Sequence, residues 1–207
     1  MNVDDPLKPI NEIFKADRDF YNETIKDRHS ALSEIVLNTT VPPKVAQLIE
    51  TAKNLSLYSY YAYRFHQPAE LFGFIALELA LKERARAEGI VKKSLTFKWL
   101  IEYAIENTWI DFRTDPDLIR KATEYARRAN SYELFCSLDG VASLLEPTSE
   151  QISEQLKNLA SEDRLKNILH SNRQLRNALA HDYGYLAPTS IKSLKDIVYI
   201  INQLFDD

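Results

Sequence analysis

The sequence is poor in the residues on which β-rich and disulfide-bonded folds depend. Glycine occurs four times in 207 residues, whereas sheets with tight hairpins use glycine at their turns. The single cysteine, Cys136, excludes an intramolecular disulfide framework. Apolar runs are only a few residues long, so none is expected to span a bilayer, and the acidic N-terminus is unlike a signal peptide. These shortages predict a cytoplasmic, helical protein.

The usual signs of a metal or cofactor site are also missing from the sequence. It has no Gly-rich phosphate loop, no Ser–His–Asp order signature and no Cys–His arrangement. His29, His66 and His170 form no metal-binding set with nearby acids, and Pro68 interrupts the His66-x3-Glu70 pair. We therefore expect neither metal nor cofactor. A net charge of −4 gives no general attraction to nucleic acid, so any such binding must be local.

The spacing of apolar residues divides the chain into helices joined by Pro- and Asx-marked turns. A thin stripe among many charges predicts a peripheral helix over 10–29 and a short one over 31–37, ended by the tandem prolines at 42 and 43. Further helices are expected over 44–65, 69–88, 94–107, 116–138, 149–159, 164–184 and 191–205. The predicted fold class is all-α, with peripheral helices in 1–42 and a helical domain in 43–207.

Two features of these helices leave alternatives open. Five aromatic residues between Tyr58 and Phe65 cannot all face one side of a helix, so they pack in a core or interface, or form a base-stacking platform. Glu78 lies inside the most apolar segment, 69–88, where an unpaired carboxylate would be costly. Either an arginine of 164–184 pairs with it, or it reaches water at a helix edge. Gly89 is expected to end this helix.

Residues 164–184 differ from the rest of the chain in charge. From 164 to 181 there is no Asp or Glu. On a helix that turns by about 100° per residue, one face carries His170, Arg173, Asn177 and His181, with Lys166 beside them, opposite Leu165, Ile168, Leu175 and Leu179. A solvated helix face normally mixes charges of both signs. This basic face is therefore expected to meet an anion or an acidic partner.

Arg176 lies at the border of this basic face, about 140° around the helix from His181. The two side chains therefore do not face one another on a single helix. They can act together if Arg176 curls over the helix surface or if a second helix completes the site. A twofold dimer that pairs two copies of the 164–184 helix would bring in the missing groups.

Residues 176–183, Arg-Asn-Ala-Leu-Ala-His-Asp-Tyr, resemble the signature of the HEPN superfamily: an arginine, a following polar residue, and a histidine after four intervening residues. Tyr183 also matches the Arg-x4-His-x-Tyr form of toxins in HEPN/nucleotidyltransferase modules. The order of elements over roughly 43–205 is similar too: an apolar helix, the motif helix and a closing helix. The resemblance implies an antiparallel helical bundle with extra N-terminal and inserted helices, a homodimer formed along the motif helices, and often metal-independent endoribonuclease activity in toxin–antitoxin, phage-defence or RNA-processing systems.

This resemblance implies a role for each residue of the basic face. His181 would be the general acid or base, because imidazole titrates near neutral pH. Arg176 would stabilise charge on the phosphorane, and Asn177 would orient His181 or the phosphate. Lys166, His170 and Arg173 would hold the RNA backbone. Tyr183 would be a modification site through which a nucleotidyltransferase-type antitoxin silences the protein.

Other interpretations of the same residues remain. His181 could be a histidine stabilised by the dipole at a helix C-terminus, and Lys166 and Arg173 could belong to a solvated face. Residues 1–42 and 90–147 have no placed counterpart in the family; they could cover the site, bind a partner or set the choice of RNA. The alternative function is a non-catalytic HEPN-like interaction module that binds a protein or nucleotide partner.

Overall fold

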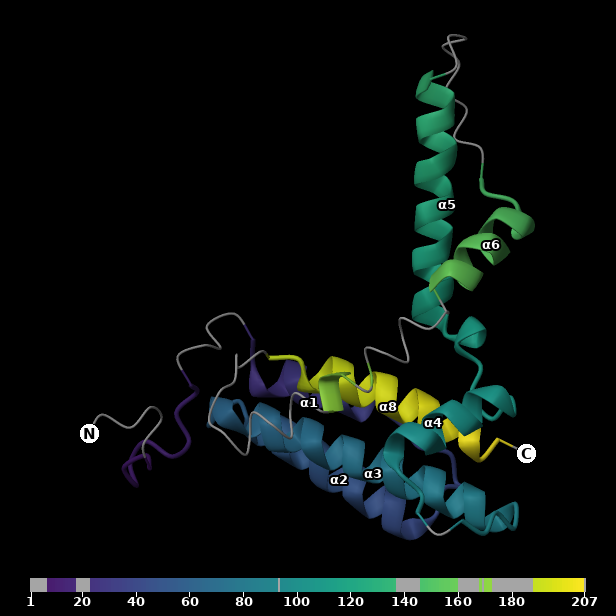
Figure 1. Ribbon diagram of the computed structural model, residues 1–207. Helices are drawn as coiled ribbons and strands as arrows, with labels where there is room; N and C mark the ends of the chain where they lie inside the picture. Colours follow the sequence, from purple (N-terminus) through teal and green to yellow (C-terminus); the bar gives the residue numbers. More distant parts are fainter. Residues whose placement is uncertain are drawn as a thin grey trace.

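The computed structural model describes residues 7–17, 23–92, 94–136, 146–159, 168, 170–172 and 188–206. Every regular element in these ranges is a helix (Figure 1), which confirms the predicted all-α fold class. Within the same ranges no helix is both long and apolar enough to cross a membrane. The elements are α1 (Ile25–Ser33), α2 (Pro43–Tyr58), the 3-10 helix η1 (Tyr63–Phe65), α3 (His66–Ala87), α4 (Phe97–Glu106), the 3-10 helix η2 (Phe112–Thr114), α5 (Pro116–Cys136), α6 (Ser149–Leu159) and α8 (Ser190–Leu204).

Helix α3 is the centre of the bundle, because it packs against α2, α8 and α4. Its inner face includes Leu77 and Leu81, which are fully buried together with Ile49 of α2 and Ile201 of α8. Burial of each such side chain contributes about 1.5–3 kcal/mol. Gly73 permits the close approach of α8, since a Cβ there would lie 2.9 Å from Cδ1 of Ile197. The core is therefore built by segments that are far apart in the sequence.

Hydrogen bonds at both ends of α8 fix the directions of the helices. At its start, Thr189 donates to Glu70 in the first turns of α3. At its end, the Asn202 side chain accepts from the backbone N–H of Asn38, just before α2. Helices α3 and α8 thus run in the same direction, and α2 runs opposite to both.

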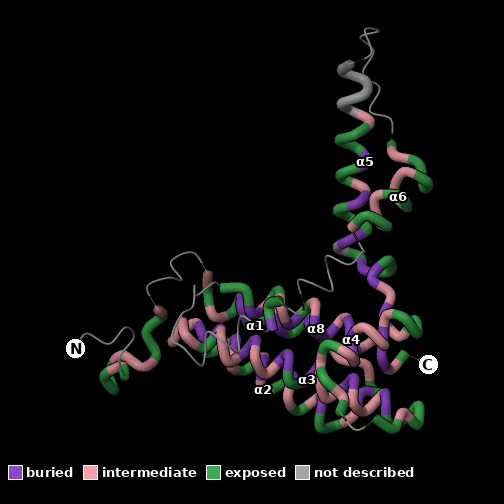
Figure 2. The backbone as a smooth tube through the Cα atoms, in the orientation of Figure 1, coloured by how far each residue is buried: buried purple, intermediate pink, exposed green. Residues whose placement is uncertain are grey.

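Helices α5 and α6 form an arm that projects away from the bundle (Figure 1). They pack against one another, and the side chains of Asn130 and Gln151 exchange hydrogen bonds of 2.8 and 3.3 Å between them. Most of the described residues along the arm are exposed or half-buried (Figure 2). Helix α6 starts as predicted, because Thr148 forms a capping box with Gln151.

The predicted helices over 10–29 and 31–37 have the wrong bounds, and residues 18–22 lie outside the described residues. Residues 10–14 form turns, and α1 begins at Ile25, where Thr24 and Asp27 form a capping box. It ends at Ser33. The apolar residues whose spacing predicted a helix over 10–14, such as Ile10 and Phe14, have exposed side chains. Without burial, a short amphipathic pattern does not stabilise a helix.

The described residues bear on the other two questions left by the sequence. Helix α2 ends at Tyr58 rather than at residue 65, so the aromatic residues that follow lie in turns and η1. Tyr60 and Tyr61 pack edge to face, and Phe14 packs on Tyr61, which is side-chain packing against the N-terminal segment. Glu78 forms an ion pair of 2.7 Å with Lys82 one turn later on α3 and is half-buried. Gly89 follows α3 with φ of 70°, as expected of a glycine that ends a helix.

Candidate functional site

The residues of the predicted RNase site lie mostly outside the described residues. This applies to Lys166, Arg173, Arg176, Asn177, His181 and Tyr183. His170 is described: it is helical and exposed. The roles predicted for all seven residues stay predictions.

The described residues next to the motif show which way this part of the chain faces. Ile168 is half-buried and packs against the hydrophobic core, whereas His170 is exposed. Asn172 lies about 200° around a helix from His170 and is 4 % exposed. At this point one side of the segment is therefore directed to the core and the side with His170 to solvent, as the apolar pattern predicts.

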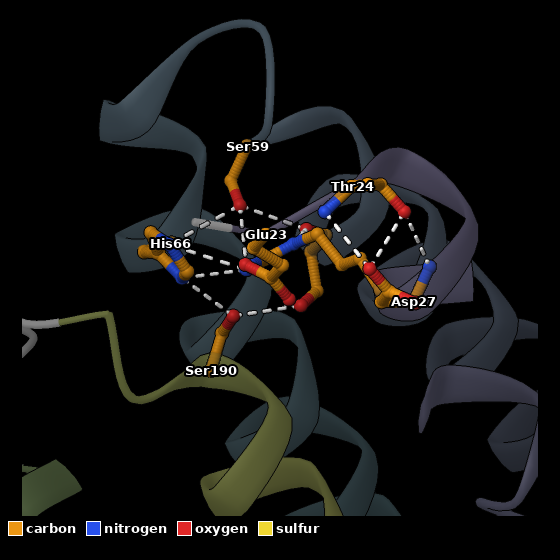
Figure 3. A network of polar contacts seen from close by, with 8 residues as sticks. Glu23, Thr24, Asp27, Ser59, His66 and Ser190 are labelled. Carbon is orange, nitrogen blue, oxygen red and sulfur yellow. Dashed lines mark hydrogen bonds and ion pairs between the residues drawn. The ribbon is translucent and has the colours of Figure 1, made fainter. Parts of the chain in front are cut away.

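Directly after the motif region, the start of α8 is held by a buried polar cluster. We define this cluster as Arg28, Ser56, Ser59, His66 and Ser190, which come from α1, the end of α2 and its C-cap, the start of α3 and the start of α8 (Figure 3). All five residues are at most 2 % exposed. Buried polar groups are tolerated when they are hydrogen-bonded, and this cluster satisfies that requirement.

Arg28 is the central hydrogen-bond donor of the cluster. Its Nε donates to the backbone oxygen of Ser56 at 2.8 Å, and its Nη2 donates to Oγ of Ser59 at 2.9 Å. Its Nη1 forms an ion pair of 2.8 Å with Glu23, which is partly exposed. Burial lowers the pKa of the guanidinium, and Glu23 opposes that shift. Arg28 therefore joins α1 to the end of α2.

His66 continues the cluster toward α8. Nη2 of Arg28 lies 3.2 Å from Nε2 and 3.5 Å from Nδ1 of His66. Because arginine only donates, the nearer nitrogen, Nε2, is the acceptor. Nδ1 then carries the proton and donates to Oγ of Ser190 at 2.6 Å. Ser190 in turn lies 2.7 Å from Oγ of Ser56. This chain of hydrogen bonds connects α1, α2 and α3 to the first residue of α8.

The Ser190–His66 pair has the spacing of a nucleophile and its base but not their environment. Burial, together with the positive charge of Arg28, lowers the pKa of His66 from 6.5 to about 4, so the imidazole is a weak base. Ser190 is fully buried, so no substrate reaches its hydroxyl. The cluster is therefore a structural element that fixes the entry to α8.

Glu70, one turn after His66 on α3, also holds the start of α8. Its carboxylate accepts from Oγ1 of Thr189 at 2.5 Å and from Oγ of Ser193 at 3.1 Å. Burial raises the pKa of Glu70, and the two hydrogen bonds oppose that shift. A carboxylate is also favoured at a helix N-terminus by the helix dipole. His66 and Glu70 thus anchor the chain where it leaves the motif region.

His66 should leave a signature in the pH dependence of stability. The unfolded histidine binds a proton below about pH 6.5, but the folded one only below about pH 4. Lowering the pH through this window therefore favours the unfolded state, by about 3 kcal/mol at its end. We expect the free energy of unfolding, measured in urea between pH 7 and 4, to fall more steeply for the wild type than for His66→Gln.

Comparison with His66→Gln isolates this effect because other titrating groups remain in both proteins. Glu70 acts in the opposite sense: its raised pKa means that it loses stabilisation as the pH rises through its titration. Parallel pH profiles for the two proteins would show that His66 is not buried in its neutral form.

The sequence offered little signal for this cluster. The spacing of His66 and Glu70 was noticed, but only as a metal-ligand pair interrupted by Pro68. Pro68 in fact lies in the first turn of α3, where proline is tolerated, and both side chains face α8. Arg28 lies in a segment with many charges, and nothing local distinguishes it from its exposed neighbours.

The described residues contain no group of three His, Cys, Asp or Glu side chains that could hold a metal ion. No family model, curated protein or solved structure matches the chain. The geometry defines an all-α protein in which α3 anchors the start of α8, a few residues after a basic segment without Asp or Glu.

Proposed function

We propose that this protein is a HEPN-type, metal-independent endoribonuclease, with Arg176, Asn177 and His181 as its catalytic residues. The observation that carries the proposal is the Arg-Asn-x3-His-x-Tyr motif, whose part from Arg176 to His181 lies in a run without Asp or Glu in an otherwise acidic chain. The all-α fold supports it, as does the exposed His170 opposite the inward Ile168. Lys166, His170 and Arg173 would bind the RNA backbone.

The proposed reaction needs only one proton-transferring group and one cation. The 2′-oxygen of the ribose attacks the adjacent phosphorus while its proton is removed, and the bond from phosphorus to the 5′-oxygen of the next nucleotide breaks. That oxygen takes up a proton as it leaves. His181 serves this proton transfer, and Arg176 stabilises the extra negative charge on the phosphorane oxygens. The products are a 2′,3′-cyclic phosphate and a free 5′-hydroxyl.

Incubation of the full chain with total tRNA or mRNA in EDTA tests the proposal. We expect cleavage that persists in the chelator and leaves 2′,3′-cyclic phosphate ends. Substrate RNA methylated at every 2′-oxygen should remain intact, since the nucleophile is blocked. The control is His29→Ala, which removes an exposed histidine of α1 far from the motif in sequence and should leave cleavage unchanged.

Intact RNA after incubation with a folded, dimeric protein would argue for the non-catalytic interaction module instead. A nucleotidyltransferase-type antitoxin acting on Tyr183 would then have to be excluded, by mass spectrometry of the purified protein. If Tyr183 is unmodified and no RNA is cut, the proposed nuclease function is wrong.

A further inference from the structure

A row of three aromatic rings lies on α4 and the turn that follows it. We define this aromatic row as Trp99, Tyr103 and Trp109. The ring centroids of Trp99 and Tyr103 are 4.9 Å apart with an interplanar angle of 31°, and those of Tyr103 and Trp109 are 5.2 Å apart and nearly perpendicular. All three residues are half-buried. Helix α4 lies against α3 in the bundle (Figure 1), so the row is supported from below and open to solvent in part.

Each end of the aromatic row carries a cation. Nζ of Lys92 lies 3.9 Å from the centroid of Trp99, and the guanidinium carbon of Arg84 lies 5.7 Å from that of Trp109. Lys92 is exposed, so its ammonium is open to solvent and can contact an anion. Arg84 pairs with Glu88 at 2.9 Å, but its Nε is buried and makes no hydrogen bond within the described part of the chain.

The turn that positions Trp109 is strained. Thr108 has φ of 58°, a left-handed conformation that is unfavourable for a β-branched residue. The strain is held by the backbone N–H groups of Thr108 and Trp109, which donate to Ile105 and Ala104. Strained residues that persist in folded proteins cluster at ligand-binding sites. A turn selected for stability alone would place glycine or asparagine at this position.

We infer that the aromatic row with Lys92 and Arg84 is a binding site for unpaired nucleobases of single-stranded RNA. Partly exposed rings flanked by cations match this ligand, because bases stack on aromatic faces while Lys and Arg neutralise the phosphates between them. Double-stranded RNA is excluded by the same chemistry, since its bases have no free face. The choice of RNA as the ligand rests on the proposed function. In that case the site would select unpaired RNA as the substrate of the motif residues.

Intrinsic fluorescence tests this inference without requiring cleavage. The chain has two tryptophans, and both belong to the aromatic row, so the signal reports on this site. The full chain is titrated with a short 2′-O-methyl oligouridylate, which cannot be cut, and in parallel with a duplex and with heparin, a polyanion without bases. We expect quenching by the single strand alone.

Variants separate stacking from charge. Trp99→Leu keeps an apolar side chain and leaves Trp109 as reporter; it should weaken binding roughly tenfold or more. Lys92→Ala should lower the slope of log affinity against log salt by about 0.7. The matched control is Tyr125→Leu, which removes an aromatic ring of α5 that is 45 % exposed and should bind as the wild type does.

Three results would overturn the inference: no quenching by the single strand, equal quenching by heparin, or unchanged affinity in Trp99→Leu. Circular dichroism of each variant shows that it is folded. Quenching without RNA cleavage, by protein whose Tyr183 is unmodified, would leave this site standing and the proposed nuclease function wrong, so the two failures are distinguishable.

Discussion

Replacing Arg28 by methionine is expected to lower the free energy of unfolding by about 3–5 kcal/mol. Methionine fills a similar volume but donates no hydrogen bond. Its introduction removes the guanidinium donor from the backbone oxygen of Ser56, Oγ of Ser59 and Nε2 of His66. Only the single hydroxyl of Ser59 then remains to donate to the Ser56 oxygen or to Nε2 of His66. Each unsatisfied buried group costs about 1–3 kcal/mol. Urea unfolding followed by far-UV circular dichroism at pH 7 measures the change.

The matched control is Lys26→Met, two residues earlier on α1, where the side chain is exposed. It should change stability by no more than about 0.5 kcal/mol. A double variant, Arg28→Met with His66→Gln, should be less destabilised than the two single losses added together, because the two side chains share a hydrogen bond. If Arg28→Met is as stable as Lys26→Met, the buried polar cluster does not hold the bundle together.

Helices with a sustained apolar stripe and a clear end signal were predictable from the sequence. Helix α6 starts at a Thr148 capping box, and α3 ends before Gly89. In both cases the residues that set the boundary act within one turn of it. Residues 10–14, which were predicted to be helical but form turns, show the limit of such reasoning. Their apolar spacing is correct for a helix, but burial decides whether a short amphipathic pattern folds, and burial depends on the rest of the chain.

The buried polar cluster could not have been predicted in the same way. Ser56 and Ser190 are 134 residues apart, yet their hydroxyls meet at 2.7 Å. A serine at a helix end has the same local signature whether it caps that helix or bonds to a distant partner. The predicted catalytic residues were found by the opposite route, through a contiguous motif and an unbalanced charge pattern. Local sequence patterns thus suggested the proposed catalytic residues, whereas the buried polar cluster follows from contacts between residues far apart in the sequence.

The position of the contacts that hold the start of α8 bears on the proposed function. His66 and Glu70 hold α8 at Ser190 and Thr189, a few residues after Tyr183 in the sequence. Catalytic groups need to be held within fractions of an ångström by rigid surroundings. Anchoring the chain immediately after the motif would limit the movement of its C-terminal end. Arg28 contacts His66, so its loss should disturb this anchor and impair both stability and any activity of the motif.

Replacing His181 by alanine is expected to lower the rate of RNA cleavage by about 10²–10⁴-fold, since it removes the proposed proton-transferring group. Arg176→Ala should lower it by about 10²–10³-fold, because the charge on the phosphorane loses its stabilising cation. Single-turnover cleavage in EDTA measures both losses. Neither variant should unfold, which thermal melting verifies.

Mixing the two inactive variants tests whether the site forms between two chains. On one helix Arg176 and His181 point about 140° apart, so we expect each catalytic pair to join residues of different chains. A dimer of one Arg176→Ala chain and one His181→Ala chain keeps one intact pair, formed by His181 of the first and Arg176 of the second. After subunit exchange about half of the dimers are mixed and each has one of two pairs, so about a quarter of the wild-type activity should return. A mixture that stays inactive despite exchange, detected with chains of different mass, would show that Arg176 and His181 act within one chain or do not act together.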